Sequence, residues 1–184
     1  PRRLVLLAKN IDGYRNLCQL SSIGYQEGFY WKPRIDYEVI KKYSDNLIAL
    51  SGGNRGELID TYFKEGADAA EAKAVRSKEI FGANFYIELS RTIHGQGSDI
   101  DSFLIGLSRK LDIPVVAGND VHYLNQEDQV AQEVLICIGT NRTLSDESRY
   151  RLGSNEFYFK APHVMRDLFE DIPEAVTNTQ VIAD

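Results

Sequence analysis

The chain has 184 residues, 43% of them apolar and 26% charged, a composition typical of one soluble globular domain or most of one. Its 21 basic and 27 acidic residues give a formal net charge of −6. This charge argues against broad nucleic-acid binding by the segment, because phosphate contacts require clustered Lys and Arg. No apolar run is long enough to predict a membrane span.

Cys18 and Cys137 are the only cysteines. Each falls in an apolar helical pattern, which predicts buried free thiols and a reducing cytoplasm rather than a disulfide framework. The first residue is Pro1 rather than Met, a strand-like run begins almost at once, and the last residues are still helical in pattern. We therefore expect both ends to continue in a longer protein.

Short apolar runs alternate with helical patterns through the first two thirds of the chain. Strands are expected at 4–8, 47–50, 85–89 and 115–117, and helices at 12–28, 35–43, 57–64 and 67–81. All four strands are expected to be parallel, because they have the near-continuous apolar character of strands buried on both faces. This rhythm favours an α/β fold, either a barrel or an open sheet.

Before the last of these strands, apolar residues recur at helical spacing and predict an amphipathic helix packed on the sheet. Its stripe consists of Ile100, Phe103, Leu104, Leu107 and Leu111. After residue 126 the pattern changes to one helix, two short strands at 149–152 and 156–160, and two closing helices, the second opened by Pro173.

Chemistry is expected in the loops that follow the strands, because functional residues of parallel α/β folds collect at the carboxyl ends of strands. Asp120 and His122 follow the strand at 115–117. If the backbone is extended there, their side chains point the same way. A carboxylate and an imidazole converging at a strand end suit zinc or manganese. Alternatively, Asp120 caps a turn and His122 packs beside Tyr123.

Two further loops carry candidate residues. Glu88 ends its strand and His94 lies six residues later, so either could join a metal site. Glu88 could instead pair with a base such as Arg91, and His94 could be an exposed loop residue. In the first loop, Gly52 and Gly53 precede a helix start, where backbone amides can hold an anion.

Three segments resemble one known family in the correct order along the chain. They are LLAKN at 6–10, VVAGNDVHY at 115–123 and EFYFK at 156–160. Together they resemble the alpha subunits of bacterial DNA polymerase III, within the PHP domain that precedes the polymerase core. The resemblance covers nearly the whole chain.

The resemblance implies part of a PHP-type distorted (β/α)7 barrel, similar to a TIM barrel. Residues 1–125 would form the barrel, without its N-terminal strand and first metal motif, and 126–184 the end of the PHP region and the start of the link to the polymerase. The implied metal ligands are Asp120 and His122, with Glu88 and His94 matching a middle motif more loosely. Gly53 stands where metal-binding members often have Cys.

For the parent chain the resemblance implies a DNA-directed DNA polymerase with a divalent metal, whether zinc, manganese or magnesium. Implied partners are the rest of the polymerase chain, DNA, dNTPs and other replisome subunits, in the cytoplasm and without a membrane. The PHP module would be structural and could carry a metal-dependent 3′–5′ exonuclease. The alternative is a free-standing PHP-family metal-dependent phosphoesterase, which the patterns at 149–160 and after Pro173 disfavour.

Overall fold

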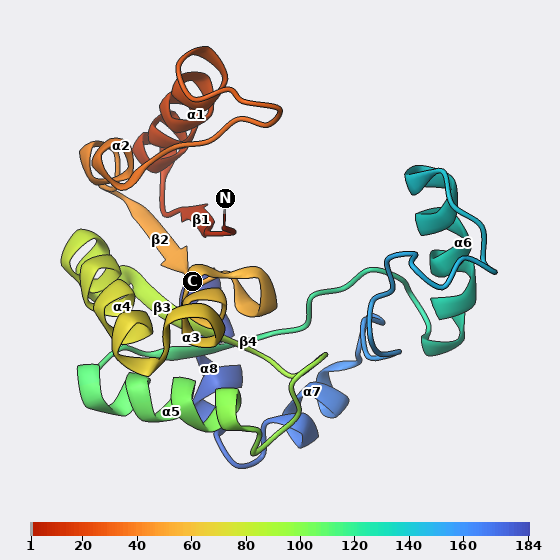
Figure 1. The fold of residues 1–184 in the computed structure, drawn as a ribbon. Helices are drawn as coiled ribbons and strands as arrows, with labels where there is room; N and C mark the ends of the chain where they lie inside the picture. Colours follow the sequence, from red (N-terminus) through yellow and green to blue (C-terminus); the bar gives the residue numbers. More distant parts are fainter. Residues whose placement is uncertain (1) are drawn as a thin grey trace.

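A four-stranded mixed sheet forms the centre of the molecule (Figure 1). The computed structural model describes residues 2–184. The strand order follows the chain, and the sheet is open. Its strands are β1 (Val5–Ala8), β2 (Leu47–Leu50), β3 (Phe85–Ser90) and β4 (Val115–Gly118).

Helices connect the strands and extend beyond them. They are α1 (Ile11–Gln26), α2 (Tyr37–Lys42), α3 (Glu57–Glu65), α4 (Ala67–Phe81), α5 (Asp99–Leu111), α6 (Gln129–Thr140), α7 (Pro162–Leu168) and α8 (Pro173–Ala183), with short 3-10 turns η1 (Gly53–Arg55), η2 (Gly82–Asn84) and η3 (Gln126–Asp128). None of the helices within residues 2–184 is long and apolar enough to cross a membrane.

The parallel arrangement is confirmed for three strands and wrong for the first. β2 pairs with β3, and β3 with β4, in parallel, as the strand–helix–strand rhythm predicts. β1 instead pairs antiparallel with β2, with Val5 opposite Leu50 and Ala8 opposite Leu47. The fold is therefore α/β with an open mixed sheet.

The reversed direction of β1 follows from its connection to β2. Helices α1 and α2 return the chain to the end of the sheet where it left, so no crossover is made. Lys9 donates its backbone N–H to the Asn46 carbonyl at 3.0 Å, and the Asn10 side-chain amide donates to Asn46 Oδ1 at 2.9 Å. These bonds join the end of β1 to the start of β2.

The main core lies where the sheet meets α4, α5 and α8. Along β3, Phe85, Ile87 and Leu89 are at most 1% exposed, while the alternating Tyr86 and Glu88 are only partly buried. Helix α5 covers this core with the predicted stripe. Ile100, Leu104 and Leu107 are each 3% exposed, and Phe103 and Leu111 are partly buried against the same cluster.

The two cysteines differ from each other. Cys137 is buried, as expected, but Cys18 is exposed. The expectation for Cys18 is wrong because the buried face of α1 is formed by Gly13, Leu20 and Gly24.

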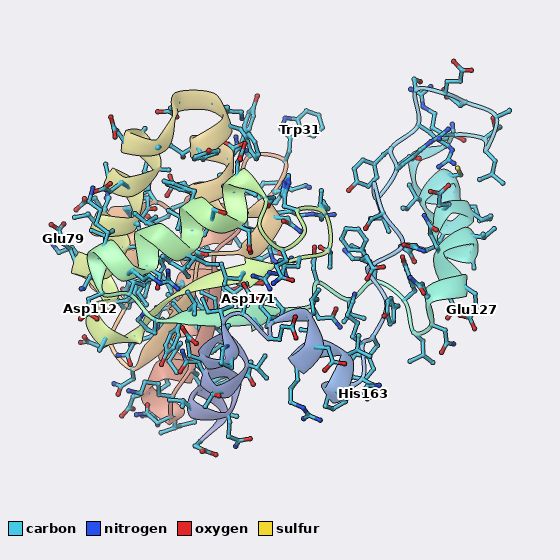
Figure 2. All side chains as sticks on the ribbon, turned by 90° about the horizontal axis from the view of Figure 1, so that it is seen from below. Trp31, Glu79, Asp112, Glu127, His163 and Asp171 are labelled. Carbon is cyan, nitrogen blue, oxygen red and sulfur yellow. The ribbon has the colours of Figure 1, made fainter. Side chains whose placement is uncertain are left out.

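Residues between β4 and α7 form an arm that stands away from the sheet, with α6 at its far end (Figures 1 and 2). The predicted strands at 149–152 and 156–160 are absent from this arm. The segment bonds to the loop after β4 instead, since Phe159 donates its backbone N–H to the Tyr123 carbonyl at 3.0 Å. Tyr123, Leu152 and Phe157 form a small second core there.

After the arm, the chain runs back to the sheet through α7 and α8. A buried arginine, Arg91, anchors the segment between these two helices. The Arg91 side chain is 0% exposed and pairs with Asp101 at 2.8 Å and with Asp171 at 2.7 Å. It also donates to the Leu168 carbonyl at 2.6 Å and lies over the Phe169 ring. Burial alone would lower the pKa of Arg91, but the two carboxylates hold it above its usual value.

Leu104→Ala should lower the free energy of unfolding by about 2–5 kcal/mol, the usual range for deleting a buried Leu side chain. The reason is that Leu104 fills the space between α5 and the sheet. Chemical denaturation measures the change. An effect near zero would contradict the packing described here.

Arg91→Met should lower the free energy of unfolding by about 3–5 kcal/mol, because it leaves the Asp101 carboxylate buried without its cation. Asp101 is 5% exposed and lies at the start of α5. The control is Arg109→Met on the exposed face of α5, which should change stability little. Equal effects of the two substitutions would show that the buried ion pairs are not stabilising.

Candidate site at the strand ends

Asp120 and His122 come together in the loop after β4. His122 Nε2 lies 3.7 Å from Asp120 Oδ1, and the two side chains are 23% and 11% exposed. Arg3, just before β1, donates from Nη1 to Asp120 Oδ1 at 3.3 Å. The site thus combines two candidate ligands with a guanidinium that sequence reasoning did not include.

The extended backbone assumed for this pair is wrong. Asp120 has φ 46°, in the left-handed region, which Asp tolerates better than most residues. His122 is positioned by the arm: its backbone N–H donates to the Phe157 carbonyl at 2.8 Å, and its ring meets the Phe157 ring edge-on at 5.2 Å. The loop is therefore shaped by contacts with the arm rather than by continuation of β4.

Glu88 is the most enclosed acid of the site. Its backbone N–H donates to Ser51 Oγ at 2.9 Å, and Glu88 Oε2 is buried without a hydrogen-bond partner. Burial raises the pKa of Glu88, the Arg3 charge opposes that shift, and the Asp120 charge adds to it. Glu88 does not pair with Arg91, whose partners are other carboxylates.

The glycine turn after β2 faces this carboxylate. Gly52 and Gly53 have φ 90° and 53°, so both use left-handed backbone that glycine adopts without strain. The Gly52 backbone lowers the pKa of Glu88 and so partly offsets the effect of burial. The negatively charged group beside Gly52 and Gly53 is thus the Glu88 carboxylate of the protein itself.

His94 lies elsewhere. Its ring packs against the Phe63 ring of α3 at 5.6 Å between centroids, and it lines a surface hollow with Asn54, Arg55 and Ile59. The structure therefore brings Asp120, His122 and Glu88 into one neighbourhood and leaves His94 outside it.

The residues present do not by themselves fit a divalent metal. Between residues 2 and 184, no group of three or more His, Cys, Asp and Glu side chains is arranged to hold one. A zinc or manganese site needs three or more protein ligands with supporting hydrogen bonds. Here the Asp120 carboxylate already bonds a guanidinium.

Comparison with known proteins agrees with the α/β fold. The PHP domain family matches residues 1–92. This chain belongs to the PHP domain family. The match covers β1 to β3, including Arg3, the glycine turn and Glu88.

Relatives of this PHP domain chain are much longer proteins. It is 44% identical over 183 residues to DNA polymerase III subunit alpha of Borreliella burgdorferi, covering 98% of the chain and 16% of that protein. It is 42% identical over 181 residues to the corresponding subunit of Treponema pallidum, with the same coverage. It is 41% identical over 172 residues to that of Thermus aquaticus, covering 94% of the chain and 14% of the relative. The resemblance to the alpha subunits is therefore confirmed.

A polar cluster beside the site of this PHP domain was not predicted. The Asn54 side-chain amide donates to Ser90 Oγ at 3.2 Å and to Thr92 Oγ1 at 2.8 Å, tying the glycine turn to the end of β3. Arg3 was also missed, because it lies 117 positions from Asp120. No spacing rule joins positions so distant, and only the sheet brings them together.

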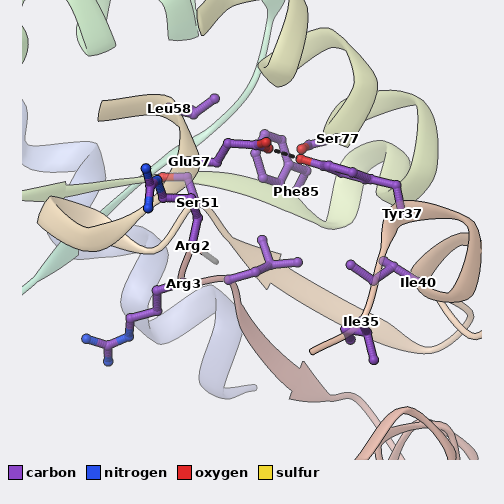
Figure 3. Close-up of a pocket in the computed structure, with 11 residues that line it drawn as sticks. Arg2, Arg3, Ile35, Tyr37, Ile40, Ser51, Glu57, Leu58, Ser77 and Phe85 are labelled. Atoms are coloured by element: carbon purple, nitrogen blue, oxygen red, sulfur yellow. Dashed lines mark hydrogen bonds between the residues drawn. The ribbon is translucent and has the colours of Figure 1, made fainter. Parts of the chain in front are cut away.

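A cavity of about 250 Å³ lies on the other side of Arg3, between β1, α2 and α3 (Figure 3). Tyr37 donates its hydroxyl to Glu57 there, and Arg76 lies 3.9 Å above the Tyr37 ring. Burial, together with the bond to Glu57, raises the pKa of Tyr37 to about 12. Tyr37 is thus a neutral hydrogen-bond donor at neutral pH.

Gly118→Ala tests how closely Glu88 is enclosed. A Cβ at Gly118 would lie 2.5 Å from Glu88 Oε1, so the carboxylate must move. We expect the free energy of unfolding to fall by about 1–3 kcal/mol, the usual cost of overpacking. Chemical denaturation measures the loss.

The matched control is Gly106→Ala in α5, where a Cβ meets nothing within 4 Å. This change should raise stability by about 0.5–1 kcal/mol through helix propensity alone. If Gly118→Ala were also neutral or stabilising, the carboxylate would not be held against Gly118.

Proposed function

We propose that this chain is the PHP module of the alpha subunit of a replicative DNA-directed DNA polymerase and that its role there is structural. The observation that carries the proposal is the similarity over 98% of the chain to proteins named DNA polymerase III subunit alpha. The chain spans 16% of the length of these relatives, so polymerisation would be carried out by other parts of such a protein.

In the full-length protein, the open sheet would be part of a distorted (β/α)7 barrel. The parallel pairing of β2, β3 and β4 supports this arrangement, because parallel strands joined by helices are the repeating unit of such barrels. The partners would be the rest of the polymerase chain, DNA and dNTPs bound by the whole enzyme, and other replisome subunits, in the cytoplasm.

A structural role is favoured over a metal-dependent 3′–5′ exonuclease by the chemistry of the strand ends. Metal-assisted hydrolysis needs a bound ion that polarises a phosphate or activates water. Asp120, His122 and Glu88 would need further ligands for that role, and Arg3 already provides a positive charge beside them. The same shortage counts against a free-standing PHP-family phosphoesterase.

Primer extension by the full-length protein tests this function. With a primed template, dNTPs and Mg²⁺, the full-length protein should extend the primer. His122→Ala in the same protein should extend it at a rate within about twofold of wild type, since substitutions away from the reacting groups rarely change transition-state binding. The 184-residue chain alone should show no extension.

Two outcomes would contradict the proposal. A full-length protein that cannot extend a primer would overturn the polymerase assignment. A metal-dependent 3′–5′ exonuclease that is present in wild type and abolished by His122→Ala would overturn the structural role and make Asp120 and His122 ligands. The assay for the second outcome uses a 3′-labelled single strand with and without a chelator.

A further inference from the structure

Arg3 is a half-exposed arginine whose guanidinium contacts an acid that is largely buried. Its side chain is 51% exposed, yet Nη1 reaches Asp120 Oδ1, which belongs to a side chain only 11% exposed. The Arg3 charge also acts on the buried carboxylate of Glu88. One guanidinium thus bonds Asp120, after β4, and acts electrostatically on Glu88, near the end of β3.

The backbone of Arg3 is held in place by the glycine turn. Its N–H donates to the Arg55 carbonyl at 3.0 Å, and Arg3 forms a parallel bridge with Gly56. The Arg3 carbonyl lies so close to Gly52 that a Cβ there would be 2.2 Å away. The side chain leaves this anchored backbone in the direction away from Tyr37 and Ile40 (Figure 3). Arg3 is therefore aimed at the strand ends by its main chain.

The two acids need a positive charge. Like charges in a partly buried site repel each other, and removing a carboxylate from water without a partner is costly. Glu88 has one oxygen with no hydrogen-bond partner, and the Asp120 charge acts unfavourably on it. A guanidinium stays protonated at all physiological pH values and is less strongly hydrated than an ammonium, so it suits such a site.

We propose that Arg3 is the resident cation of the strand-end site, and that its guanidinium holds Asp120 and Glu88 together so that no divalent metal is needed there. This inference deepens the structural role proposed above and rests on it. It gives that role a physical basis. The Arg3 guanidinium would link the acids at the ends of β3 and β4, and the Arg3 backbone is bonded to the segment after the glycine turn.

An ordinary surface ion pair is the competing explanation. Arg15 and Asp12 on α1 form such a pair at 2.8 Å, with side chains 72% and 63% exposed. Pairs of this kind contribute little, because both ions remain hydrated. At the Arg3 site, by contrast, the carboxylates of Asp120 and Glu88 are largely removed from water. The experiment below tests whether Arg3 therefore stabilises its surroundings more than Arg15 does.

Hydrogen exchange in the full-length protein tests the charge coupling. Arg3→Met should increase exchange in the peptides 50–57 and 117–123 by about tenfold, since an uncompensated buried charge favours local opening. In a Glu88→Gln and Asp120→Asn background the same change should have less than about a twofold effect, because its partners are neutral. Arg3→Lys should retain part of the protection, and Arg15→Met should leave both peptides unchanged.

Metal content gives a second readout. After chelation and dialysis against Mn²⁺ or Zn²⁺, elemental analysis should find the same amount of metal in full-length wild type and His122→Ala. The proposal is overturned if wild type holds about one additional ion that His122→Ala lacks, or if Arg3→Met acts equally in both backgrounds. Primer extension on the same samples reports separately on the polymerase assignment, so its loss would leave the Arg3 results interpretable.

Discussion

The buried guanidinium of Arg91 is the constraint on which the rest of the structure depends. A fully buried arginine must find partners for its donors, and Arg91 finds them on three different segments. Asp101 comes from the start of α5, Asp171 from the turn between α7 and α8, and a carbonyl from the end of α7. The end of β3 is thereby joined to the helix that follows it and to the chain that returns from the arm.

This junction has consequences for the strand ends. Helix α8 packs against β4 and contributes Ala175 to the main core, so the return of the chain supports the strand that leads to Asp120 and His122. Ser90 and Thr92, on either side of Arg91, hold the Asn54 amide and with it the glycine turn. The position of the glycine turn beside Glu88 is thus fixed by hydrogen bonds between residues that are not candidate metal ligands.

The strand ends gather three of the predicted ligands, but within residues 2–184 no three such side chains are arranged to hold a metal ion. Asp120 contacts His122 and acts electrostatically on Glu88. A guanidinium stands beside them, carried on a main chain that is bonded to the glycine turn. Within a polymerase chain, such an arrangement would let the domain keep its shape without metal, which accords with a structural role.

The sequence by itself determined the four strands of the sheet, the stripe of α5, the parallel order of β2 to β4 and the membership of the family. These features depend on local periodicity and on short motifs, which are complete within a few residues. Only the tertiary structure decided the direction of β1, the arm without strands and the partners of Glu88 and Asp120. The physical reason is that each of these depends on contacts between distant positions. The clearest case is the bond between Arg3 and Asp120, which exists because the sheet and the glycine turn bring two chain segments together.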